Sequence, residues 1–133
     1  MAVQALLISN GSESIRALKD DLKQLPVATR QAGSCEEATH LIGPQVDVIF
    51  TDLTLRDGNW IDVVDLARRA HSAAEVVVVS RLPDTKLYVE VMERGGFDFI
   101  TPPLGAHSLQ RLLDSATAEP AKRWGAPLRA GAA

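Results

Sequence analysis

The sequence has almost no cysteine, few aromatic residues and no long apolar run. Cys35 is the one cysteine among 133 residues, so an internal disulfide is excluded and a cysteine-built zinc site is disfavoured. A chain of this kind suits the reducing cytoplasm. No apolar run approaches the ~20 residues that a membrane-spanning helix requires, and no basic stretch precedes a secretory apolar core. We therefore expect a cytoplasmic chain that does not enter a membrane.

An excess of positive charge is also missing. The net charge of −3 and the isoelectric point near 5.5 disfavour a surface built on phosphate contacts, so we expect no direct nucleic-acid binding. Hydrophobic residues make up 46% and charged residues 23%, which is the balance of a globular domain. We place one domain at residues 1–118 and expect residues 119–133 to form a flexible tail or linker, because they hold too few large apolar side chains to bury a core.

Short apolar runs alternate with segments of helical periodicity along the domain. Runs without polar alternation are typical of strands that a parallel sheet buries on both faces. They lie at residues 5–8, 46–50 and 76–79, with a weaker strand at 27–30 and a fifth at 97–100. Helical periods follow over about residues 12–25, 34–42, 61–67, 83–94 and 109–116, and Ser12 is the predicted N-cap of the first. This order predicts an α/β fold, a flavodoxin-like (βα)5 three-layer sandwich with a parallel sheet in the order 2-1-3-4-5.

Polar residues follow the predicted strands, where a sheet of this kind binds ligands. The first strand ends in Ser9 and Asn10, the third in Asp52, and the fourth in Ser80. Residues 46–58 resemble the third strand and following loop of a response-regulator receiver (CheY-like) domain of two-component phosphorelay systems. Residues 95–104 resemble the fifth strand of that family.

This resemblance implies a role for several residues. Asp52 matches the aspartate that accepts a phosphoryl group from a histidine kinase, with Mg²⁺ bound beside it. Ser80 matches the hydroxyl residue that contacts the phosphoryl group, and Phe99 matches an aromatic residue that switches rotamer. Pro103 matches a proline that follows a cis peptide bond.

The sequence departs from the family pattern at the positions that would carry charge. Ser9 and Asn10 stand where the family has an acidic pair, and Pro102 stands where it has a lysine. Because Mg²⁺ prefers anionic oxygen ligands, we expect no bound cofactor and weak or absent phosphorylation of Asp52. Either Arg56 or Arg81 is a candidate to reach Asp52 and replace part of the missing positive charge.

The sequence therefore predicts an atypical receiver domain that is not an enzyme and acts by protein–protein interaction. Its partner would be a histidine kinase or an effector domain, or a second copy in a homodimer. The expected surface is made by the fourth helix, fifth strand and fifth helix, including Leu87, Tyr88, Val91, Phe99 and Leu112.

Two alternatives remain open. One is a functional phosphoacceptor in which Mg²⁺ binds through Asp52, Asn10 and the Thr54 carbonyl. The other is a flavodoxin-like module that binds a small ligand near the turn after the first strand.

Overall fold

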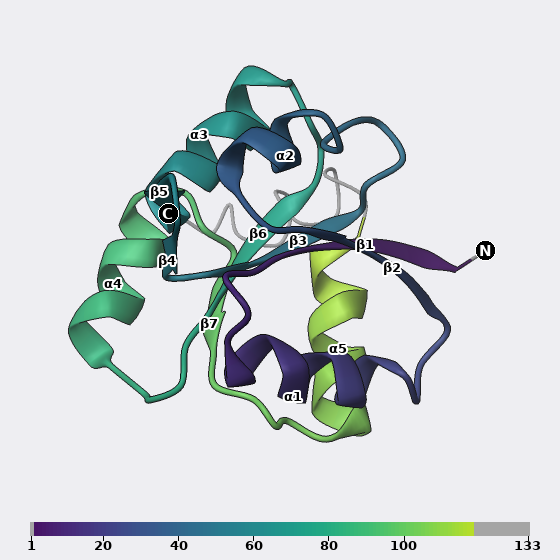
Figure 1. Cartoon of the computed structure of the whole chain (residues 1–133). Helices are drawn as coiled ribbons and strands as arrows, with labels where there is room; N and C mark the ends of the chain where they lie inside the picture. The colour runs from purple at the N-terminus through teal and green to yellow at the C-terminus, as the bar shows by residue number, and fades with distance from the viewer. Residues whose placement is uncertain (1, 119–133) are drawn as a thin grey trace.

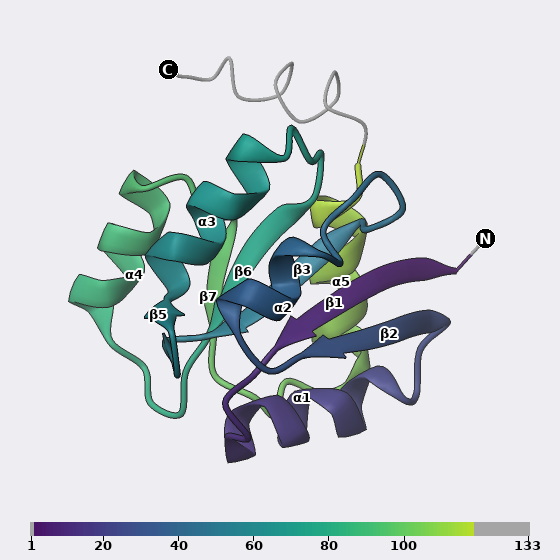
Figure 2. The ribbon, with the colours of Figure 1, turned by 45° about the horizontal axis from the view of Figure 1, so that its top comes forward.

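The computed structural model describes residues 2–118 as three layers, with a parallel sheet between two layers of helices (Figure 1). The sheet has five strands in the order β2-β1-β3-β6-β7, which is the predicted order once the strands are numbered along the chain (Figure 2). Its strands are β1 (Val3–Ile8), β2 (Val27–Ala32), β3 (Val48–Asp52), β6 (Glu75–Val79) and β7 (Asp98–Ile100). The flavodoxin-like α/β prediction is confirmed. The predicted tail at residues 119–133 lies outside the described residues.

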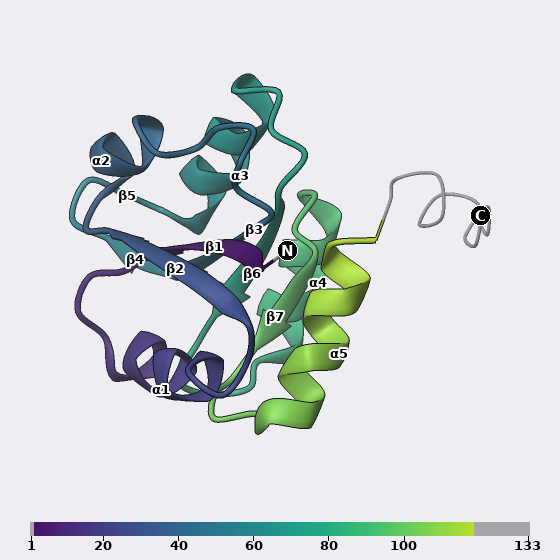
Figure 3. The same cartoon turned by 90° about the vertical axis from the view of Figure 1, so that its right-hand side faces the viewer.

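Helices cover both faces of this sheet (Figure 3). A separate apolar cluster is buried on each face. One cluster involves α1 and α5, and the other involves α2, α3 and α4. The helices are α1 (Glu13–Leu22), α2 (Cys35–Thr39), α3 (Trp60–Arg69), α4 (Thr85–Glu93) and α5 (Ala106–Ala116). The central strand β3 is buried along its whole length, as expected for a strand covered on both sides.

The segment after β3 is folded where the sequence predicted only a loop. Strands β4 (Thr54–Leu55) and β5 (Gly58–Asn59) pair antiparallel and form a two-stranded hairpin, with Arg56 and Asp57 at its turn. The hairpin leads directly into α3, whose first residue, Trp60, donates its backbone N–H to Leu53 at 3.1 Å. This hairpin therefore connects the end of β3 to the start of α3.

Helix α2 is shorter than predicted and ends at Thr39 rather than near residue 42. The backbone N–H groups of His40 and Leu41 bond three residues back, which tightens the last turn. Gly43 and Pro44 follow at once and disfavour a longer helix. Among the helices of residues 2–118, none is long and apolar enough to cross a membrane.

Candidate functional site

Asp52 lies at the carboxyl end of β3, beside the turn that follows β1. Asp52 is 4% exposed, so its carboxylate needs hydrogen-bond partners. The backbone N–H of Asn10 donates to Asp52 Oδ2 at 2.9 Å, and the hydroxyl of Ser12 donates to Asp52 Oδ1 at 2.6 Å. Both carboxylate oxygens are therefore held by neutral donors from one loop.

Ser12 is a site residue that the sequence revealed only as a helix cap. Its Oγ accepts the backbone N–H of Ile15 at 3.2 Å and so caps α1. The same atom donates its proton to Asp52. Ser9, in contrast, accepts the N–H of Gly11 at 2.9 Å. Of the two loop serines, Ser12 therefore supplies the hydroxyl that binds Asp52. In the sequence, the only indication of a role for Ser12 is its position three residues before a helical period.

Asn10 connects this loop to the hairpin. Its side-chain Nδ2 donates to the backbone carbonyl of Thr54 at 2.7 Å, at the first residue of β4. Asp52, Asn10 and the Thr54 carbonyl, the three groups considered as Mg²⁺ ligands, are thus close together. Each already takes part in a hydrogen bond between the loop after β1 and the segment at the end of β3 and the start of β4.

The residues around Asp52 do not fit a divalent cation in this arrangement. Mg²⁺ is bound by oxygen atoms and gains most from carboxylates. Within residues 2–118, no group of three or more His, Cys, Asp or Glu side chains is arranged to hold a metal ion. A cation bound here would therefore compete with the hydrogen bonds of Asp52 and Thr54, and Asp52 would be its one anionic ligand among these three groups.

Arg56 and Arg81 are the two residues expected to bring a positive charge to Asp52. Both side chains are exposed, and in the described part of the chain neither forms an ion pair with Asp52. Arg56 lies at the turn of the β4–β5 hairpin, and Arg81 follows the end of β6. The donors that the oxygens of Asp52 accept are instead the Ser12 hydroxyl and the Asn10 backbone N–H.

Ser80 lies at the same edge of the sheet, just after β6, but its hydroxyl bonds locally. Its Oγ donates to the Leu82 carbonyl at 3.1 Å and accepts the Leu82 N–H at 3.3 Å. Its backbone N–H donates to Ile100 at 2.9 Å and so positions it beside β7. Beyond β7, the peptide bond between Pro102 and Pro103 is cis, the isomer that the resemblance implies. Pro102 leaves no side-chain cation at this position.

A second cluster lies under the hairpin turn, at the start of α2. The Asp57 carboxylate accepts the backbone N–H groups of Cys35 at 2.7 Å and Glu36 at 3.0 Å, and these bonds lower its pKa. Burial raises the pKa of the Cys35 thiol to about 11, and the charges of Asp57 and Asp62 add to this effect. The helix-start position of Cys35 therefore does not yield a reactive thiolate.

Solved receiver domains share this arrangement of strands and helices. The signal receiver domain of a putative LuxO repressor protein from Vibrio parahaemolyticus superposes with a TM-score of 0.72 at 21% identity, covering 87% of this chain and 93% of that one. The receiver domain of a sensor histidine kinase from Pseudomonas aeruginosa, solved with magnesium in its cleft, gives a TM-score of 0.73 at 15% identity, covering 90% and 100%. The chain has the receiver-domain fold.

Sequence comparison points to the same class of protein. The receiver-fold chain is 28% identical over 118 residues to the response regulator protein PilR of Pseudomonas aeruginosa and 23% identical over 118 residues to the transcriptional regulator NtrC of Azospirillum brasilense. These matches cover 87% of this chain, but 26% of PilR and 24% of NtrC, so the chain spans about a quarter of the length of these curated relatives. No family model matches the chain.

The surface expected to bind a partner on this receiver fold is hollowed. A cavity of about 480 Å³ lies between α4, β7 and α5, and Tyr88, Phe97, Arg111 and Leu112 are among its lining residues. Phe99 is half-buried and lines a smaller cavity of about 210 Å³ that Tyr88 and Thr101 also line.

Two of the residues predicted for this surface are less accessible than expected. Val91 is 0% exposed, so it belongs to the core rather than to the surface. Leu87 is half-buried against the same core cluster. Both lie on the inner side of α4, because positions four residues apart share one helix face. The large exposed apolar side chains of the described residues are instead Leu82, Tyr88, Val89 and Met92.

Proposed function

We propose that this chain is an atypical receiver domain of a two-component system, in which phosphorylation of Asp52 is weak or absent. Its fold is the receiver fold, and its sequence is similar to two regulators of that class. We further propose that it works in the cytoplasm as a binding module rather than as an enzyme. These proposals concern the domain, because the matched region is about a quarter of each relative.

The observation that carries this proposal is the charge around Asp52. Phosphoryl transfer depends on cations that stabilise the transferring oxygens. Ser9 and Asn10 bring no negative charge to hold such a cation, and Pro102 brings no positive charge of its own. Asp52 itself is held by Ser12 and Asn10. The position of the nucleophile is thus retained without charges that would make it reactive.

The test is a phosphorylation assay read by intact mass. The full chain is incubated with acetyl phosphate and MgCl₂, in parallel with the Asp52→Asn variant as the matched control. We expect the mass of the unmodified chain to persist in both samples. A gain of one phosphoryl group in the wild type that is absent from Asp52→Asn would contradict the proposal.

That contrary result would establish the second candidate, a functional phosphoacceptor. Its support is that Asp52 stands at the carboxyl end of the central strand, and that a receiver domain of similar fold holds magnesium in its cleft. In this function Asp52 would be the nucleophile, with Mg²⁺ held by Asp52, Asn10 and the Thr54 carbonyl.

The proposed partner is another protein, either a histidine kinase or an effector domain, and a second copy of the chain is the alternative. The support is the apolar surface on and before α4, formed by Leu82, Tyr88, Val89 and Met92, which continues at Tyr88 into the cavity beside β7 and α5. Three of these residues lie on α4, and grouped exposed apolar side chains are typical of interaction sites.

A small-ligand module has weaker support. A phosphate-binding turn needs backbone N–H groups that point to the ligand. In this turn the N–H groups of Asn10 and Gly11 already donate to Asp52 and Ser9.

A further inference from the structure

Three hydrogen bonds join the β1–α1 loop to the end of β3 and the start of the hairpin. They connect Asn10 N–H with Asp52 Oδ2, Ser12 Oγ with Asp52 Oδ1, and Asn10 Nδ2 with the Thr54 carbonyl. Each spans at least 40 residues of sequence, so the group is a tertiary contact rather than a local turn. We call these four residues the Asp52 clasp.

The clasp satisfies each group that a cation would otherwise satisfy. The buried Asp52 carboxylate and the Thr54 backbone carbonyl are oxygen ligands of the kind that Mg²⁺ prefers. Here the carboxylate receives an O–H and an N–H, and the carbonyl receives an amide N–H. Hydrogen bonds to a charged acceptor are stronger than those between neutral groups.

Ser12 holds the clasp together because its hydroxyl both donates and accepts a hydrogen bond. A serine hydroxyl has a single proton to donate, and Ser12 gives it to Asp52 while its lone pair accepts the N–H of Ile15. The position of the Asp52 carboxylate and the first turn of α1 are therefore joined through one atom.

We propose that Ser12 and Asn10 are positioning residues that hold Asp52 and the hairpin in place without a metal ion. The clasp makes the stability of the domain indifferent to Mg²⁺, and the Asn10 amide occupies the position where a carboxylate would make the domain responsive to Mg²⁺. This inference rests on the same lack of anionic groups as the proposed function, but it concerns the stability of the domain and is measured without phosphorylation.

The first test is thermal unfolding of the full chain in EDTA and in millimolar MgCl₂. We expect equal melting temperatures for the wild type in both buffers. Ser12→Ala should melt about 5 °C lower in both, because it loses a helix cap and a charge-assisted hydrogen bond. Ser9→Ala is the matched control and should stay close to the wild type, since that hydroxyl does not contact Asp52. A rise of the wild-type melting temperature with MgCl₂ would overturn the proposal.

The second test is a double-mutant cycle between Ser12→Ala and Asp52→Ala. Residues in direct contact give non-additive effects. We expect the double variant to lose less than the sum of the two single losses. Strict additivity would show that Ser12 does not position Asp52.

The third test is Asn10→Asp, which distinguishes a cation position from ordinary packing. This change replaces the Nδ2 donor with an oxygen that faces the Thr54 carbonyl and lies near the Asp52 carboxylate. We expect a lower melting temperature in EDTA and recovery in MgCl₂. Gln24→Glu adds the same charge at an exposed position and should show no response to Mg²⁺. Failure of MgCl₂ to raise the melting temperature of Asn10→Asp would overturn the assignment of Asn10. No phosphodonor is present, so this outcome is distinct from failure of the proposed function.

Discussion

Carboxylates in this domain act mainly as acceptors for backbone N–H groups. Within residues 2–118 only two ion pairs occur, Lys23–Asp20 and Arg94–Glu90, and both lie on the exposed surface. Surface pairs of this kind contribute about 0–1 kcal/mol. The acidic side chains that join distant segments accept from backbone instead, at Asp21, Asp47, Asp52 and Asp57.

Asp57 should make stability depend on pH below its ordinary pKa. Its pKa is lowered from 3.8 because it accepts the N–H groups of Cys35 and Glu36. A lowered folded-state pKa contributes stability that is complete above 3.8 and is lost as the pH falls through the lower value. Urea unfolding across acid pH should show this loss for the wild type. The Asp57→Asn variant should lack this part of the dependence, and an identical acid profile for both chains would contradict the assignment.

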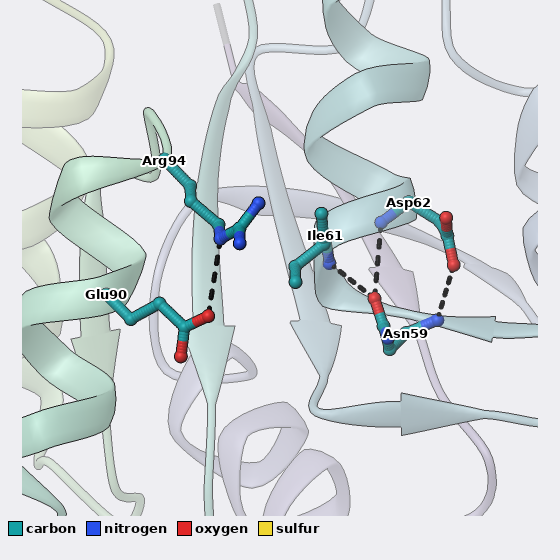
Figure 4. A network of polar contacts seen from close by, with 5 residues as sticks. All are labelled: Asn59, Ile61, Asp62, Glu90 and Arg94. Carbon is teal, nitrogen blue, oxygen red and sulfur yellow. Dashed lines mark hydrogen bonds and ion pairs between the residues drawn. The ribbon is translucent and has the colours of Figure 1, made fainter.

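At the scale of elements, the hairpin and α3 are joined by a reciprocal cap. Asn59, the last residue of β5, accepts the N–H of Ile61 at 2.9 Å and of Asp62 at 3.4 Å, and Asp62 accepts the Asn59 N–H at 2.9 Å (Figure 4). This capping box satisfies N–H groups that the first turn of α3 leaves unpaired. The hairpin therefore ends where the helix begins, which fixes the segment that follows Asp52.

Asn59→Ala should destabilise the domain by about 1 kcal/mol, because the start of α3 loses its side-chain acceptor. Asn59→Ser keeps an oxygen at this position and should retain most of the stability. Chemical denaturation of the three chains measures the difference. Equal stability of Asn59→Ala and the wild type would show that the cap contributes nothing to α3.

The sequence predicted the main elements better than the connections between them. The short, valine- and isoleucine-rich apolar runs of β3 and β6 indicate two buried strands, because runs of this length are typical of strands covered on both faces. The β4–β5 hairpin was missed because its strands have two residues each, too few to show alternation. Ser12 could be identified as a cap from local spacing, whereas its bond to Asp52 depends on residues 40 positions apart.

At the scale of the whole molecule, one buried carboxylate connects two segments on the same face of the sheet. Asp21, near the end of α1, is 7% exposed and accepts the backbone N–H of Leu104 at 2.8 Å. Leu104 directly follows Pro103 in the segment that leads from β7 to α5. This bond spans 83 residues and joins the first helix to the entrance of the last.

Asp21→Ala should therefore cost about 1–3 kcal/mol, since it leaves the N–H of Leu104 without its acceptor. Asp20→Ala, at the neighbouring exposed position, removes only a surface ion pair and should cost about 1 kcal/mol or less. Urea unfolding of both variants gives the comparison. If the two variants are equally stable, the α1–α5 connection does not depend on Asp21.

The two borders of the sheet have a consequence for how other proteins can approach this domain. One border is β2, whose residues from Ala28 to Gln31 are exposed and include Arg30, and the other is β7, which is three residues long. A polar edge strand such as β2 and an edge strand of three residues such as β7 are both poor templates for pairing with a strand from another molecule. Binding through main-chain strand pairing is therefore disfavoured, and a protein partner is expected to bind the side chains on the helices instead.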